Sequence, residues 1–87
     1  MNAKIREYLA NNYPDSYLFD DFDEAIIGIS TTGAVIYEFD KIIHILMGYL
    51  DNMTYEEAVE YFDYNIERKL PYMNEGIAPV IMKNIEI

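Results

Sequence analysis

The predicted fold depends most on the stretch Ala-Ile-Ile-Gly-Ile-Ser-Thr-Thr-Gly-Ala-Val-Ile-Tyr-Glu-Phe, residues 25–39. Two runs rich in Ile, Val and Tyr flank a Thr-Thr-Gly segment, which is typical of a β-hairpin with a three-residue loop. Gly33 supplies the left-handed backbone conformation that such a loop needs. A two-residue loop would scatter the apolar side chains over both faces of the hairpin. The three-residue loop pairs Ile29 with Val35 and Ile27 with Tyr37 on one apolar face.

Two further segments on either side of the hairpin predict helices. Residues 3–12 place apolar side chains at helical spacing, and Pro14 prevents the helix from continuing. Residues 41–50 are apolar nearly all round, and Asp40 precedes them as a candidate N-cap. A helix of that composition is either central in the fold or covered on its second side by another subunit.

The helix predicted over residues 55–68 carries the clearest signals in the chain. Thr54 and Glu57 have the spacing of a capping box, in which each side chain accepts a hydrogen bond from the backbone N–H of the other residue. The helical period then predicts an inward apolar stripe and an outward acidic one. The inward stripe comprises Tyr55, Val59, Phe62 and Ile66, and the outward one comprises Glu56, Glu60, Asp63 and Glu67.

A last strand is predicted over residues 78–82, with Pro79 either at its start or on a sheet edge. The element order is then α-β-β-α-α-β. The sequence therefore predicts one α+β domain over residues 1–87, with three helices packed on a small three-stranded sheet of antiparallel type.

Negative charge dominates the composition. Sixteen Asp and Glu oppose six Lys and Arg, which gives a net charge of −10, and Lys41 is the single basic residue between Glu7 and Glu67. Such a chain repels nucleic acid and anionic membranes. The chain also lacks the apolar run of a signal peptide or of a membrane span of about 20 residues. We expect a cytoplasmic protein that binds neither membrane nor nucleic acid directly and whose macromolecular partner presents a basic surface. A charge that only maintains solubility is the alternative.

Side chains that catalysis usually requires are scarce. The chain has no Cys and a single His, His44, which excludes disulfides, thiolate metal sites and Cys nucleophiles. An EF-hand loop starting at Asp21 would need an oxygen ligand and a Gly where Ala25 and Ile26 stand. We therefore expect a protein that is not an enzyme and holds no metal or cofactor.

Five runs of the sequence resemble a widespread set of small acidic proteins encoded by bacteriophages and prophages. These runs are residues 22–29, 35–41, 45–47, 53–65 and 78–81. The resemblance implies a phage origin and the same compact α+β unit, and it carries no catalytic residue over to this chain.

Charge and resemblance together predict a phage-encoded modulator that binds a host protein. In its sharpest form this is an anti-defence inhibitor, such as an anti-CRISPR protein, that mimics DNA by occupying a basic nucleic-acid-binding surface. An accessory phage protein that forms a homodimer through residues 41–50 is the alternative. The candidate partner-binding residues are Glu56, Glu57, Glu60, Tyr61, Asp63, Tyr64, Glu67, Asp20, Asp21 and Asp23.

Overall fold

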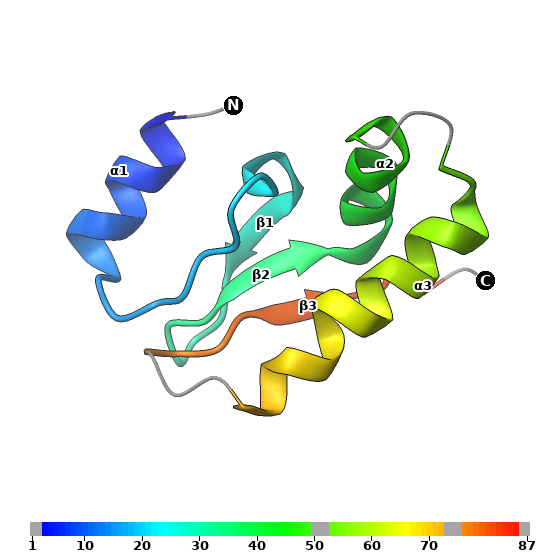
Figure 1. Ribbon diagram of the computed structural model, residues 1–87. Helices are drawn as coiled ribbons and strands as arrows, with labels where there is room; N and C mark the ends of the chain where they lie inside the picture. Colours follow the sequence, from blue (N-terminus) through cyan, green and yellow to red (C-terminus); the bar gives the residue numbers. More distant parts are fainter. Residues whose placement is uncertain (1–2, 50–52, 73–75, 86–87) are drawn as a thin grey trace.

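The computed structural model of the chain describes residues 3–49, 53–72 and 76–85. It confirms the α+β class and the order α-β-β-α-α-β (Figure 1). Two short 3-10 helices, η1 and η2, join the predicted elements. The elements are α1 (Ala3–Asn12), η1 (Asp23–Ala25), β1 (Ile26–Ile29), β2 (Val35–Glu38), α2 (Phe39–Tyr49), α3 (Tyr55–Asn65), η2 (Glu67–Tyr72) and β3 (Val80–Met82).

The three strands form a mixed sheet of order β1-β2-β3, with β2 in the centre. β1 and β2 are antiparallel, whereas β3 runs parallel to β2, so the predicted antiparallel character holds for one pair only. The connection between β2 and β3 explains the difference, because α2 and α3 carry the chain back to the end of the sheet where β2 begins. A crossover of this kind delivers the next strand in parallel. Pro79 precedes β3, which is an edge strand, as predicted.

The hairpin has the predicted three-residue loop but a different register beyond its first pairs. The Ser30 N–H donates to the carbonyl of Ala34 over 2.8 Å, and Gly33 has a φ of 89°. Ile29 pairs with Val35 as predicted, but a β-bulge follows, and Tyr37 faces Ile26 instead of Ile27. The extra residue turns the Ile27 side chain outward, where it is 40% exposed.

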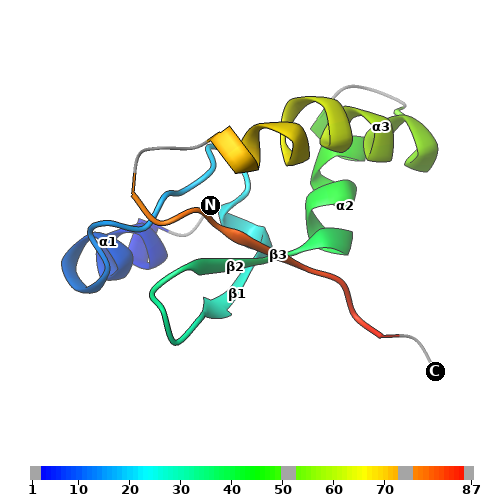
Figure 2. The same ribbon diagram turned by 90° about the horizontal axis from the view of Figure 1, so that it is seen from below.

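α2 and α3 cover one face of the sheet. Side chains alternate across β2, so Val35 and Tyr37 are fully buried on the covered face and Ile36 is half-buried on the other. Val80, which lies next to Ile36 in the parallel register, is 44% exposed. Figure 2 shows α2 and α3 on the same side of the sheet. The molecule is thus a two-layer structure with its core between sheet and helices.

α2 begins directly after β2, at Phe39, so Asp40 lies within its first turn and is not its N-cap. The Asp40 carboxylate still interacts favourably with the positive end of the helix dipole. The chain itself buries one side of α2, since Ile42 and Ile43 are fully buried and Leu46 is 3% exposed. Ile45 and Met47 are half-buried, and the dimer through residues 41–50 stays a prediction. The predicted end of this helix, residues 50–52, lies outside the described residues.

α3 begins as predicted. The Glu57 N–H donates to Thr54 Oγ1 over 3.2 Å, and the Thr54 N–H donates to Glu57 Oε1 over 2.9 Å, which completes the capping box. Phe62 and Ile66 are buried as predicted, but Tyr55 is 50% exposed. Side chains lean toward the N-terminus of a helix, so that of the first residue projects past the end of the packed surface. The α-helix ends at Asn65, and the predicted last turn is instead part of η2.

No helix among the described residues is both long enough and apolar enough to cross a membrane.

Candidate functional site

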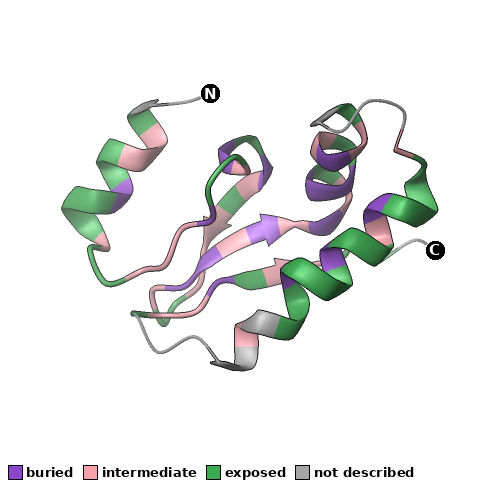
Figure 3. Ribbon diagram, in the orientation of Figure 1, coloured by how far each residue is buried: buried purple, intermediate pink, exposed green. Residues whose placement is uncertain are grey.

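The outward side of α3 is acidic along its whole length. Between Tyr55 and Asn65 the helix carries four acidic residues and no basic one. In Figure 3 most of α3 has the colour of exposed residues, interrupted by the buried residues Ala58 and Phe62 of its inward side. We call the following exposed residues the acidic face: Glu56, Glu60, Tyr61, Asp63, Tyr64 and Glu67.

Two carboxyl groups of the acidic face lie close enough to interact directly. Asp63 and Glu67 are four residues apart, and a hydrogen bond between their side chains raises the pKa of Glu67 above its ordinary value. Lys83 acts in the opposite direction but does not cancel the effect. Two neighbouring carboxyl groups repel when both are ionised, which disfavours the charged form of one of them. A cation placed over this pair would relieve the same repulsion.

Glu57 has a structural role in addition to its charge. Its side chain accepts the Thr54 N–H, and this hydrogen bond lowers the pKa of Glu57. One oxygen of this exposed carboxylate is therefore engaged at the start of α3. Among the seven candidates from the third predicted helix, Glu57 is the capping-box residue of the helix.

Two tyrosines stand among these carboxylates. Tyr61 is 38% exposed and Tyr64 is 65% exposed. The guanidinium of Arg68 lies 4.2 Å from the centre of the Tyr64 ring, which is cation–π distance. This surface already binds a guanidinium of its own chain, so an arginine from a partner would meet the same chemistry.

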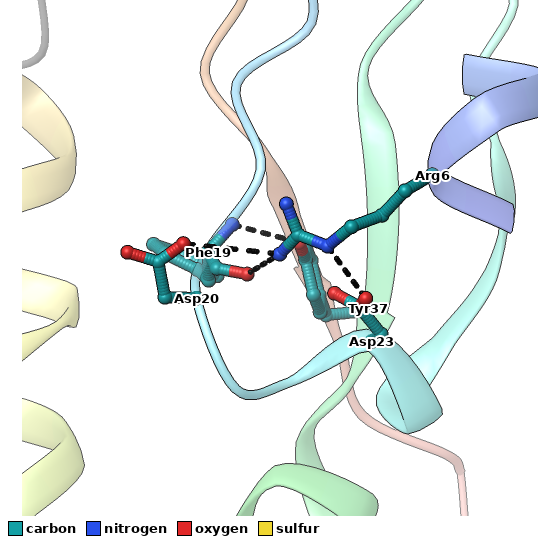
Figure 4. Close-up of polar contacts among 5 residues, drawn as sticks. All are labelled: Arg6, Phe19, Asp20, Asp23 and Tyr37. Carbon is teal, nitrogen blue, oxygen red and sulfur yellow. Dashed lines mark hydrogen bonds and ion pairs between the residues drawn. The ribbon is translucent and has the colours of Figure 1, made fainter. Parts of the chain in front are cut away.

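Asp23 is not part of the candidate site, contrary to the prediction. Its side chain is 3% exposed, and Arg6 Nε donates to Asp23 Oδ2 over 2.6 Å (Figure 4). The hydrogen bond to Asp23 raises the pKa of Arg6. Asp23 belongs to an acidic run in the sequence, but a buried carboxylate needs a cation beside it, and α1 supplies one from 17 residues earlier.

The same arginine connects three parts of the fold. Arg6 Nη2 donates to the carbonyl of Phe19 over 2.9 Å, and the Phe19 N–H donates to the Tyr37 hydroxyl, also over 2.9 Å. Burial raises the pKa of Tyr37 to about 12. These bonds attach α1 and the segment before η1 to the central strand (Figure 4). They hold residues 19–23 in place and so position the two aspartates between.

Those two aspartates, Asp20 and Asp21, do lie beside α3. Both are exposed, and the Asp20 side chain, which is 96% exposed, points toward α3 (Figure 4). Asp21 has a φ of 70°, a conformation that Asp tolerates better than most residues. Both line a cleft of about 260 Å³ that the sequence did not reveal. The other lining residues are Phe22, Leu46, Tyr61, Asn65 and Ile66.

His44 is exposed on α2, and its Nδ1 lies 2.7 Å from the carbonyl oxygen of Asp40. Within residues 3–49, 53–72 and 76–85, no three His, Asp or Glu side chains are arranged to hold a metal ion. The expectations about catalysis and cofactors stay predictions.

No protein-family model matches the chain, and the comparisons with curated proteins and with solved structures found no significant similarity. The resemblance to phage proteins therefore stays a prediction, and function has to be inferred from the site.

Proposed function

We propose that this is a binding protein that attaches to a basic surface of a partner protein through the acidic face. The observation that carries the proposal is the uniform sign of α3, four acidic residues without a basic one on a helix whose outward side is exposed. Ordinary exposed helices mix charges, because pairs of opposite sign three or four residues apart stabilise them. α3 forgoes that stabilisation.

The interacting carboxyl groups support the same conclusion. The side-chain hydrogen bond from Asp63 raises the pKa of Glu67, so the ionised form of Glu67 is disfavoured in the absence of a partner cation. Exposed tyrosines next to these acids add contact area, and Tyr is enriched among residues that dominate binding energy. A partner rich in Arg and Lys would satisfy both kinds of group.

The mechanism that we propose is competition with nucleic acid. Carboxylates on one side of α3 recur about every 5.4 Å along the axis, whereas DNA carries a phosphate about every 3.4 Å per strand. α3 alone is therefore too sparse to imitate a strand. Asp20 and Asp21 stand beside it across the cleft and increase the density of charge on this side. In its sharpest form, the protein is a phage inhibitor of a host defence nuclease, acting in the host cytoplasm.

The experiment is capture of partners from nuclease-treated bacterial lysate on the immobilised protein. The test variant is the double charge reversal Glu60→Lys/Asp63→Lys. It should fold normally, because exposed helix positions tolerate Lys well. The matched control is Glu7→Lys/Asp15→Lys, which changes the net charge equally at exposed positions away from α3. We expect a basic nucleic-acid-binding protein to be retained by the wild type and the control and lost by the test variant. Equal retention by all three proteins, or equal loss by both variants, would contradict the proposal.

A further inference from the structure

The cleft beside α3 is lined by both polar and apolar residues. Its exposed lining residues are Asp20 and Asp21 from the loop before η1 and Tyr61 and Asn65 from α3. Its less exposed lining residues, which we call the floor, are the apolar residues Phe22, Leu46 and Ile66. Its volume of about 260 Å³ is below the range of about 300–1,000 Å³ typical of small-molecule sites. A single long side chain from another protein is of a more suitable size.

The exposed lining residues offer hydrogen-bond acceptors and an aromatic ring. Asn65 Nδ2 donates to the Tyr61 carbonyl over 3.1 Å, which leaves the Asn65 side-chain oxygen as an acceptor. Asp20 lies 3.9 Å from Arg6, too far for a hydrogen bond, and is otherwise surrounded by solvent. The cleft thus combines hydrogen-bond acceptors with apolar surface, and Tyr61 is among the residues that line it.

We propose that this cleft takes an arginine side chain of the partner protein. The methylene stem of arginine would lie on the apolar floor, as long basic side chains do on apolar surfaces. Its guanidinium would donate to Asp20 and Asp21 from one side and stack against Tyr61 on the other. Arg68 on Tyr64 is the same pairing one turn further along α3, within this chain. Arginine suits the site better than lysine, because its flat group has five donors and stacks on rings.

The proposal rests on the proposed function, since it identifies one anchor within the same contact with a basic partner. It is testable without that partner. The probe is N-acetyl-arginine amide, titrated into isotopically labelled protein and followed by amide chemical shifts. N-acetyl-citrulline amide has nearly the same shape without the charge and serves as the matched ligand. Nα-acetyl-lysine amide, which keeps its side-chain ammonium, tests whether the cleft prefers a guanidinium.

We expect saturable shifts with the arginine probe at residues 20–22, 61, 65 and 66, weaker shifts with lysine and none with citrulline. Asp20→Asn/Asp21→Asn should reduce the affinity about tenfold or more, as expected when hydrogen bonds to a charged group are lost. Asn also accepts the positive φ of Asp21, so the fold should persist. Glu7→Gln/Asp15→Asn removes the same charge elsewhere and should bind like the wild type.

Three results would overturn the proposal: equal shifts with citrulline, shifts spread over the acidic face without a maximum at the cleft, or equal weakening in both double variants. These results are separable from failure of the proposed function. Arginine binding in the cleft, combined with partner capture that survives Glu60→Lys/Asp63→Lys, would keep the cleft and reject the acidic face.

Discussion

Replacing Arg6 by Met removes the cation that lies against the buried carboxylate of Asp23 while keeping a side chain of similar length. Asp23 is 3% exposed and would be left without a positive partner. The hydrogen bond from Arg6 Nη2 to the Phe19 carbonyl would be lost as well. We therefore expect Arg6→Met to destabilise the whole domain, although the residue lies on the terminal helix α1.

The magnitude follows from the burial of the two partners. Removing one partner of a buried ion pair costs about 3–5 kcal/mol. The Arg6 side chain is 35% exposed, so solvent screens part of the interaction, and we expect about 3 kcal/mol, the lower end of this range. A domain of this length has a total stability of about 4–13 kcal/mol. The melting temperature should then fall by about 12–24 °C.

Thermal and urea denaturation measure the effect, and two variants isolate its cause. Asp23→Asn in the Arg6→Met background removes the stranded charge and should restore part of the stability. Asp20→Asn removes an exposed acid 3.9 Å from Arg6 and should change stability by less than about 1 kcal/mol. An Arg6→Met protein that melts within the error of the wild type, or as little affected as Asp20→Asn, would refute a buried pair between α1 and η1.

Three further substitutions have defined outcomes. Thr54→Ala should lower the melting temperature by several degrees in a calorimetric scan, because it removes a capping side chain that contributes about 0.5–2 kcal/mol. Tyr37 should lose its proton in a late step of an alkaline absorbance titration, at about pH 12, and Tyr37→Phe should abolish this step. Its folded pKa of about 12 lies above the ordinary value of 10.0, so its contribution to stability is complete below pH 10.0 and is lost as the pH rises through about 12. Glu67→Gln should raise the melting temperature at neutral pH. The reason is that Asp63 raises the pKa of Glu67, so the ionised form of Glu67 is disfavoured in the folded state. At a pH well below the ordinary pKa of Glu, where Glu67 is protonated in both states, the substitution should not raise the melting temperature. An unchanged or lower melting temperature for Glu67→Gln at neutral pH would show that these two carboxyl groups do not repel.

Local signals in the sequence predicted the parts of the fold that depend on neighbouring residues. The capping box at Thr54 and the three-residue loop ending at Gly33 each need only a short stretch of chain, and both are confirmed. The bulge that displaces Ile27 was not predictable in this way. Ile26 and Ile27 are equally apolar, so hydrophobic pattern does not decide which of them faces the core.

Features that depend on distant residues were predicted less well. The direction of β3 is set by the crossover through α2 and α3, and its own sequence is compatible with either direction. The burial of Asp23 depends on Arg6, a residue that the sequence predicts in the separate helix over residues 3–12. The exposure of the acidic face followed from helical phase alone. The cleft could not be predicted from helical phase, because it arises where residues 20–22 meet α3.

The central claim, that the acidic face binds a basic surface used for nucleic acid, is tested most directly by the affinity of the captured partner at rising salt, with and without competing duplex DNA. We expect affinity to fall with salt, as exposed charge pairs are screened, and DNA to displace the protein. Glu60→Lys/Asp63→Lys should bind weakly at every salt concentration, mainly through slower association. An affinity that is independent of salt, unaffected by DNA and equal in wild type and double reversal would contradict the claim.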